Sequence, residues 1–184
     1  MSLLSQLGYR YPKRNFMRRA LVRLASSRPA AWVAARIMPA LDGRLLSLSN
    51  GRFSLSEVVA GTPVISLTTR GAKSGQLRTA YLLAIPVDEK VAVIGTNFAQ
   101  KDTPGWVHNL RRHPGGTVNF RGQRLEVVAR EVEGPEYERV FAAAALVYPG
   151  FAVYRARLTE RRPKVFMLER SENDDARTMT DTST

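Results

Sequence analysis

Residues 68–79, with the sequence TTRGAKSGQLRT, have the composition of an anion-binding loop. Three cations, Arg70, Lys73 and Arg78, stand there with two glycines and five side chains that carry a hydroxyl or an amide. Glycine leaves backbone N–H groups accessible, so such a loop can curl into a nest of donors around an anion. An ordinary hairpin needs only a short turn with one or two residues suited to positive φ. A solvated basic loop is the alternative that composition alone leaves open.

A second candidate cluster, GTNFAQKDTPGWVHNLRRHP, covers residues 95–114. The chain leaves an expected strand at residues 95–97 and enters an expected helix, with Thr103 as N-cap and Pro104 at the first helical position. The first N–H groups of a helix have no intrahelical partner and can bind an anion or a carbonyl. Two basic loops at this separation therefore favour a small anionic ligand.

The side chains of the second cluster suggest a flat ligand and argue against protein-based catalysis. Phe98 and Trp106 offer flat faces to a ring, although Trp106 and Leu110, four residues apart on one helix, fit a core position equally well. His108 and His113 lack nearby carboxylates, so no metal site is predicted. No Ser-His-Asp arrangement or paired carboxylates stand near the basic residues. Any chemistry is therefore expected to belong to a cofactor.

The elements that must position these clusters are mostly strands. Apolar alternation and β-branched residues predict six strands, near 63–69, 79–86, 90–96, 116–120, 123–132 and 163–169. Gly122 predicts a tight hairpin between the fourth and fifth strands. Two helices interrupt the strands, one from about residue 103 and one from Pro135 that ends at Pro149-Gly150. The predicted class is mostly β with flanking helices (α+β), as a closed or half-closed barrel of about six strands.

Length and charge define the organisation of the chain. The 184 residues contain no cysteine and carry a net charge of +12, and 184 residues suit one domain with a real core. No stretch has the roughly 18 uninterrupted apolar residues of a membrane span. The expected division is a basic region of amphipathic helices at 1–44, a barrel domain at 45–170 and a disordered polar tail at 171–184.

The partner of the basic N-terminal region stays open at this point. Residues 1–40 hold eight Lys/Arg and no Asp/Glu. In residues 14–26 the apolar positions follow the spacing of one helical face, with arginines on the rest of the circumference. Such a helix can lie on an anionic membrane, or it can pack on its own domain with a solvated basic face. A nucleic-acid binder is a rival reading, but no recognition module matches and none is predicted as a partner.

The two clusters together resemble the deazaflavin-dependent nitroreductase family, the actinobacterial split β-barrel proteins that bind coenzyme F420, an 8-hydroxy-5-deazaflavin. The likeness covers about residues 45–170 and includes LVYPGFAVYRARLTERRPKVFMLE, where the family carries tyrosines ahead of an arginine, a proline and the last strand. The resemblance implies an FMN-binding-like split barrel. It also implies an oxidoreductase that moves a hydride from reduced F420 to a planar, electron-poor small-molecule acceptor, such as a quinone, an enone or a nitro compound.

The resemblance also implies the site residues. The phosphate and oligoglutamate tail would lie in the loop that contains Arg70, Ala72, Lys73, Ser74 and Arg78. The ring would lie between two groups, Thr79, Ala80, Tyr81, Leu82 and Leu83 on one side, and Ile94, Gly95, Thr96, Asn97, Gly105, Trp106, Val107, His108 and Asn109 on the other. Phe151 would cover the ring. Tyr148 and Tyr154 would meet the acceptor, to orient it or to donate a proton, with solvent as the alternative donor.

Several positions depart from the family pattern. Ala72 stands where an arginine is common, Leu77 where a proline is usual, and Phe98-Ala99 where Gly-Gly is common. Phe151 lacks a hydroxyl that some relatives carry. FMN is the rival coenzyme, and a non-catalytic coenzyme carrier is the rival function. The expected location is the cytoplasm, with peripheral contact to the inner face of the cell membrane if the basic helix binds lipid; the sequence predicts no oligomeric state.

Overall fold

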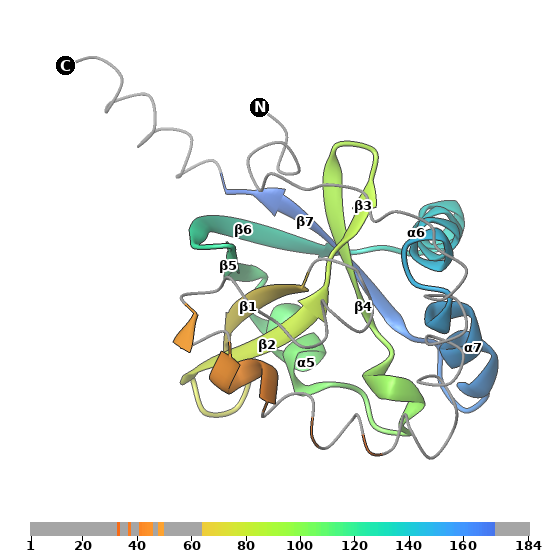
Figure 1. Cartoon of the computed structure of the whole chain (residues 1–184), viewed down its shortest axis with the longest axis horizontal. Helices are drawn as coiled ribbons and strands as arrows, with labels where there is room; N and C mark the ends of the chain where they lie inside the picture. Colours follow the sequence, from red (N-terminus) through yellow and green to blue (C-terminus); the bar gives the residue numbers. More distant parts are fainter. Residues whose placement is uncertain (1–32, 34–36, 38–40, 46–47, 50–63, 172–184) are drawn as a thin grey trace.

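The computed structural model of the protein describes residues 33, 37, 41–45, 48–49 and 64–171 (Figure 1). From residue 64 onward the strands are β1 (Val64–Arg70), β2 (Leu77–Leu83), β3 (Ile85–Val87), β4 (Lys90–Gly95), β5 (Gly115–Phe120), β6 (Gln123–Glu131) and β7 (Lys164–Arg170). The helices are the 3-10 helix η1 (Asn97–Ala99), α5 (Gly105–Arg112), α6 (Gly134–Val147) and α7 (Gly150–Arg157). The predicted mixture of a β core and flanking helices is therefore present.

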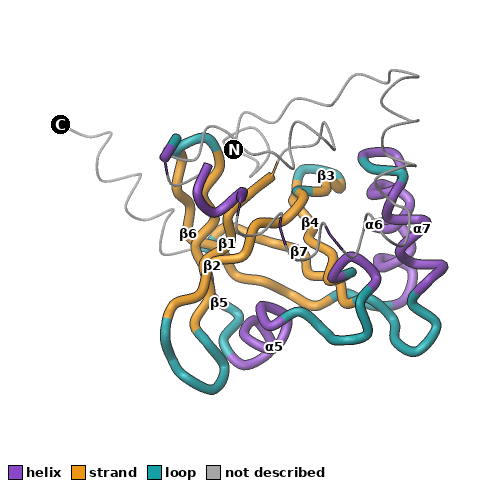
Figure 2. Tube along the Cα trace, turned by 60° about the horizontal axis from the view of Figure 1, so that its bottom comes forward, coloured by secondary structure: helices purple, strands orange, loops and turns teal. Residues whose placement is uncertain are grey.

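The strands form one antiparallel sheet that curls back on itself. The strand order is β2-β1-β5-β6-β7-β4-β3, so β2 and β3 stand at opposite ends of the sheet. Yet only Ala84 separates β2 from β3 in the chain, and β2 also contacts β4. One continuous bent segment therefore belongs to both edges. This arrangement makes a half-closed barrel, visible from two directions in Figures 1 and 2.

Two apolar cores lie on the two faces of β4 and β7. Val91 and Val93 face the barrel interior, while Ala92 and Ile94 pack outward against α6 and α7. The same alternation on β7 places Phe166 inside the barrel and its neighbours outside. Because successive side chains of a strand point to opposite faces, a strand buried on both faces has an almost continuous apolar sequence.

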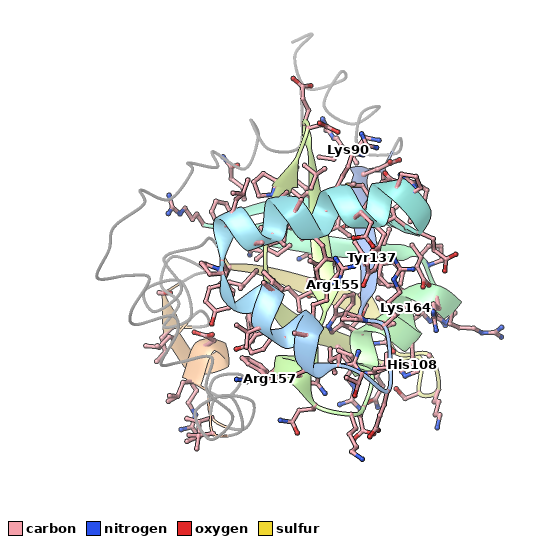
Figure 3. All side chains as sticks on the ribbon, turned by 90° about the vertical axis from the view of Figure 1, so that its right-hand side faces the viewer. Lys90, His108, Tyr137, Arg155, Arg157 and Lys164 are labelled. Atoms are coloured by element: carbon pink, nitrogen blue, oxygen red, sulfur yellow. The ribbon has the colours of Figure 1, made fainter. Side chains whose placement is uncertain are left out.

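The helices occupy two different places around the barrel. The apolar side of α5 joins the interior core of the barrel through Trp106, Val107 and Leu110. Helices α6 and α7 lie side by side over the outer core, as Figure 3 shows. Tyr137 of α6 and Arg155 of α7 lie between these two helices, with the Arg155 guanidinium carbon 5.7 Å from the centre of the Tyr137 ring. The fold thus places α5 and α7 around the end of the barrel where β4 finishes.

Several predicted boundaries are confirmed, and others are wrong. The hairpin with Gly122 is present between β5 and β6, and Arg121 and Gly122 both have positive φ, as a tight hairpin turn requires. The predicted strand 79–86 is divided at Ala84, because its two halves pair with different neighbours. Helix α5 has Pro104 as its N-cap and not Thr103.

Helix α7 is absent from the sequence-based prediction. Pro149-Gly150 does end α6, which finishes at Val147. The same dipeptide then begins a new helix, since Pro149 has φ −56° and ψ −22° and serves as its N-cap. A proline is compatible with the start of a helix as well as with the stop after one, so the local signal is ambiguous.

The predictions for both ends of the chain lie largely outside the described residues. The basic helix predicted at 14–26 does not fall within them, nor do residues 172–184 of the tail predicted at 171–184. Val33, Ile37 and residues 41–45 are helical, and the expected division at residue 44 stays a prediction. Among the residues that the structure describes, no helix has the length and apolar character needed to cross a membrane.

Ion pairs fasten α5 to the sheet. Arg111 of α5 donates two hydrogen bonds to the Glu131 carboxylate at the end of β6, at 2.7 and 2.8 Å. Lys164, the first residue of β7, lies 3.1 Å from the same carboxylate. The hydrogen bond from Arg111 holds the pKa of Glu131 below its ordinary value of 4.5. Glu131 therefore connects three elements around the end of the barrel.

We expect acid to weaken this connection. Because the folded-state pKa of Glu131 is lowered, its contribution is complete above about pH 4.5 and is lost as the pH falls through the lower folded value. Glu131→Gln should lower the free energy of unfolding by roughly 0.5–1 kcal/mol at neutral pH, and this difference should shrink in acid. Urea unfolding from about pH 7 to about pH 3 measures it. The exposed Glu89→Gln is the control, and a difference that stays constant with pH would contradict the pairing.

Candidate functional site

The basic loop between β1 and β2 has a defined backbone. The Gly71 N–H donates to the carbonyl of Gln76 at 2.8 Å, and the Gly75 N–H donates to the carbonyl of Gly71 at 2.9 Å. Gly75 has φ +68°, a conformation that favours glycine. The Ser74 hydroxyl accepts a hydrogen bond from the Gln76 N–H at 3.3 Å. The loop is thus a compact, hydrogen-bonded turn between β1 and β2.

Asn109 fastens this loop to α5. Its Oδ1 accepts a hydrogen bond from the Ala72 N–H at 2.9 Å, and its Nδ2 donates to Thr69 Oγ1 at 3.0 Å. Only 9% of Asn109 is exposed, so both bonds form away from bulk water. The Asn109 side chain is therefore already occupied, which leaves its backbone for the predicted coenzyme contact, and it joins the two clusters found in the sequence.

The loop cations have different surroundings from those cations of the described residues that form ion pairs. Ion pairs to carboxylates are formed by Lys90, Lys101, Arg111, Arg130, Arg155, Arg162 and Lys164. In the described part of the chain, Arg70, Lys73 and Arg78 have no carboxylate within ion-pair distance, and Arg78 reaches only Gln76 Oε1 at 3.4 Å. Positive charge that the protein does not neutralise is available to an anionic ligand.

The end of β4 approaches the start of α5. A Cβ built on Gly95 would lie 3.0 Å from a Val107 methyl and 3.6 Å from the ring of Pro104. Gly105 is exposed, and among the described residues no atom lies within 4 Å of a Cβ built on it, so these residues leave space beside the first turn of α5. Thr96 is buried and Asn97 is half-buried. Free helix N–H groups, an open space and a strand end therefore meet at one place.

The side chains of β2 divide between two faces. Ala80 and Leu82 pack toward the barrel core, whereas the Thr79 hydroxyl lies 2.9 Å from that of Thr68 on the exposed face. Tyr81 lies against Gly43. Because of this alternation, only some of the side chains of residues 79–83, the run predicted to pass along the ring, can face one ligand. A ligand along β2 would contact one face of the strand.

Trp106 of α5 resolves an alternative that the sequence left open. Trp106 is 8% exposed and packs edge-on against Phe166, with ring centres 5.8 Å apart. Of the two readings, the core position is therefore correct, and only the backbone of Trp106 remains for a coenzyme. His108 is exposed on the same helix, and its side chain is labelled in Figure 3.

An aromatic cluster lies where η1 meets α7. Tyr148, Phe151 and Tyr154 are all buried, at 7%, 4% and 5% exposure. The Phe98 ring meets Tyr154 edge-on at 6.3 Å, and Tyr148 meets Phe151 edge-on at 5.8 Å. The three predicted residues of α7 and its approach are thus brought together. They form a wall of packed rings and not an exposed surface.

Sequence reasoning missed Arg161. Its guanidinium donates hydrogen bonds to backbone carbonyls of the segment that follows β4. The adjacent Arg162 instead pairs with Glu138 at 3.1 Å and lies over the Tyr137 ring at 3.7 Å. Nothing in the sequence TERRPK shows which of the two arginines turns inward. The only signal for Arg161 in the sequence was its position just before the last strand.

The site therefore has a cationic end and an aromatic end. The cations Arg70, Lys73 and Arg78 lie at the β1–β2 loop, and Asn109 joins this loop to α5. The start of α5 faces the end of β4, and η1 leads on to the aromatic wall. Within the described ranges, no group of three or more His, Asp or Glu side chains could hold a metal ion. A flat molecule with an anionic tail matches such an arrangement.

Comparison with known proteins agrees with this description. Residues 47–170 match the family described as F420H(2)-dependent quinone reductase. Relatives with that description from Mycobacterium tuberculosis, and with a "putative" one from Mycobacterium bovis, are 30% identical over 95 residues. The matched stretch covers 50% of this chain and 63% of theirs. The match confirms the coenzyme that the sequence predicts.

Solved structures support the same fold. An F420-H2 dependent reductase, FDR-A, is 32% identical, with a TM-score of 0.54, and the similarity covers 58% of this chain and 94% of that one. A structure described as a domain-swapped dimer is 29% identical, with a TM-score of 0.56, and covers 77% of this chain and 99% of that one. These similarities confirm the predicted split β-barrel.

Proposed function

The chain belongs to the F420H(2)-dependent quinone reductase family, and from that premise we propose that it reduces a planar, electron-poor acceptor with the reduced deazaflavin. A quinone is the first candidate, with an enone or a nitro compound as further members of the same chemical class. The observation that carries the proposal is the contact between the two clusters. The hydrogen bond from the Ala72 N–H to Asn109 joins the loop that carries Arg70, Lys73 and Arg78 to the middle of α5, the helix that begins beside Gly95.

The residues of the site fit a polyanion attached to a flat ring. We assign Arg70, Lys73 and Arg78 to the phosphate and tail, since charge-assisted hydrogen bonds to phosphate or carboxylate oxygens are the strong ones. The backbone at Gly95 and Gly105 borders the space for the ring. When bound, the coenzyme supplies the hydride, so that no side chain needs to act as a nucleophile.

The protein's own task is to orient the reactants and to keep water away from them. Packed rings such as Tyr154 and Phe98 limit the entry of water on the α7 side, and fixed geometry lowers the entropic cost of bringing two reactants together. The hydroxyl of Tyr148 or Tyr154 would orient the acceptor oxygen or give it a proton. Solvent is the alternative proton source.

Titration of the purified protein with oxidised F420 and with FMN, followed by fluorescence, tests the proposal. We expect F420 to bind more tightly, because the oligoglutamate tail adds negative charges next to Arg70, Lys73 and Arg78. Turnover of a soluble quinone with reduced F420 then separates a reductase from a carrier. Equal or tighter binding of FMN would indicate that FMN is the coenzyme of this site. Tight F420 binding without turnover of any acceptor would indicate a non-catalytic coenzyme carrier.

Conservative changes in the aromatic wall should alter turnover more than coenzyme affinity. Tyr148→Phe and Tyr154→Phe each remove one hydroxyl and keep the packed ring, and we expect a loss of roughly tenfold or more in kcat if that hydroxyl donates the proton, as general acid catalysis predicts. If it only orients the acceptor, KM should rise instead. Steady-state rates with a quinone and a nitroaromatic compound distinguish the two. Unchanged rates for both variants would remove these tyrosines from the reaction.

We also propose that the basic N-terminal region brings the site to a membrane, where quinones dissolve. The eight cations and no acidic residues of residues 1–40 support this, since each basic residue near an anionic surface contributes about 1 kcal/mol. The full chain should sediment with phosphatidylserine vesicles at low salt and less at high salt. Deletion of residues 1–40 should abolish sedimentation and leave F420 binding intact. A truncated protein that still sediments, or an intact one that never does, would contradict this.

A further inference from the structure

The segment after β4 has an unusual backbone. Asn97, Phe98 and Ala99 have φ values of 49°, 52° and 61°, one after another. Left-handed residues are common for glycine and tolerated by asparagine, but a bulky side chain such as that of Phe98 rarely adopts this conformation. Such strained conformations persist only where the surrounding structure enforces them. Something must therefore hold residues 97–99 in place.

Local hydrogen bonds hold the turn only in part. The Ala99 N–H donates to the carbonyl of Thr96 at 3.0 Å, and the Gln100 N–H donates to that of Asn97 at 2.9 Å. The Asn97 side chain donates to the carbonyl of Asp102 at 3.1 Å. These bonds bring no donor to the carbonyls of Gly95, Gln100 and Lys101, and only one to the carbonyl of Thr96.

Arg161 lies three residues before the start of β7, the strand that pairs with β4, and it donates to all four of these carbonyls. Nη1 donates to the Gly95 carbonyl at 3.0 Å, and Nη2 donates to the Thr96 carbonyl at 2.9 Å. On the other side of the turn, Nη2 reaches the Gln100 carbonyl at 3.0 Å, and Nε reaches the carbonyls of Lys101 at 2.9 Å and of Gln100 at 3.3 Å. One planar group thus connects the beginning and the end of the turn.

The contact between Arg161 and the turn depends on the directions of its hydrogen bonds more than on an ion pair. Arg161 donates hydrogen bonds to backbone carbonyls, whereas its neighbour Arg162 pairs with the Glu138 carboxylate. Burial lowers the pKa of Arg161, and the charge of Asp102 only partly opposes this. The guanidinium carries its donors in a rigid fork, whereas a lysine ammonium is a single point charge. Lysine could keep the charge but could not reach both sides of the turn.

We propose that Arg161 is a positioning residue that holds residues 95–101 in their left-handed turn and so sets the β4 side of the coenzyme site. The inference rests on the proposed function, because the site is the one assigned above. The same turn carries Phe98 to its edge-on contact with Tyr154. We call the hydrogen bonds from Arg161 to residues 95–101 the clamp. Its loss should therefore disturb both the border of the ring space at Gly95 and the aromatic wall.

The first test needs no coenzyme. Arg161→Lys should speed amide hydrogen exchange at Ala99 and Gln100, whose bonds close the turn, by about tenfold or more if the turn opens locally. Exchange within β4 and β7 should change little. Arg162→Lys is the matched control, since it alters the neighbouring arginine and leaves the turn alone. Unchanged exchange at Ala99 and Gln100 in Arg161→Lys would overturn the clamp.

The second test connects the clamp to the site. Arg161→Lys should weaken binding of oxidised F420 by about tenfold, a change of 1.4 kcal/mol, although the charge is kept. Arg162→Lys should bind as the parent does. Normal F420 affinity in Arg161→Lys would overturn the positioning role and leave the proposed function intact. A parent protein that does not bind F420 would instead refute the proposed function and, with it, this inference.

Substitutions in the turn itself give a third test of the proposal. They can still decide it if Arg161→Lys folds poorly. Ala99→Gly removes the side chain that disfavours φ 61°, so in the Arg161→Lys background it should restore part of the lost affinity while changing the parent little. Ala99→Val, with the parental Arg161, should weaken F420 binding because a β-branched residue resists this conformation. No rescue by Ala99→Gly, together with parental affinity in Ala99→Val, would overturn the proposal.

Discussion

Replacing Lys73 and Arg78 together with alanine should weaken F420 binding by about 2–4 kcal/mol, roughly 30- to 1,000-fold, if each cation makes one charge-assisted contact. Neither cation has a carboxylate within ion-pair distance among the described residues, so their removal breaks no ion pair there. The change in the unfolding free energy should accordingly be small. Fluorescence titration and urea unfolding of the same variant measure the two quantities separately.

The control for this variant removes the same charge elsewhere. Arg124 on β6 and Arg139 on α6 are exposed and lie on other elements, and changing both to alanine lowers the net charge by the same amount. Long-range attraction would weaken equally in the two double variants, whereas direct contact would be lost in only one. The parent's affinity should also fall with salt more steeply than that of the Lys73/Arg78 variant. Equal affinities in the two double variants would remove the loop from the site.

Asn109→Leu should have the second large effect. Leucine has a similar volume but lacks the acceptor for the Ala72 N–H and the donor for Thr69 Oγ1. Because Asn109 is buried, we expect the free energy of unfolding to fall by about 2–3 kcal/mol. F420 affinity should fall as well, since the cationic loop loses its attachment to α5. Urea unfolding and fluorescence titration again measure both.

A partial variant separates stability from attachment of the loop. Thr69→Val removes the hydroxyl that accepts the Asn109 hydrogen bond and leaves the bond from the Ala72 N–H in place. It should cost about 1 kcal/mol of stability with F420 affinity near that of the parent. If Asn109→Leu binds F420 as tightly as the parent, the bond between Ala72 and Asn109 does not position the loop for the coenzyme.

Features that depend on neighbouring residues could be predicted from the sequence. The hairpin at Gly122 follows from turn chemistry, and the strands β4 and β7 follow from apolar runs that are buried on both faces. The prediction that the ligand is anionic rests on the composition of residues 68–79. In each case the physical cause, a backbone preference or a local charge, lies within a few residues of the feature that it produces.

Only the tertiary structure decided which side chains hold the site together. Asn109 meets Thr69 across 40 residues of chain, and Arg161 meets Gly95 across 66. The sequence could not tell Arg161 from Arg162, nor a core Trp106 from a ligand-facing one, because both members of each choice have the same local pattern. The two members of each choice are distinguished only by the barrel, which closes between distant strands. Its geometry determines which carbonyls lack a donor and which faces are buried.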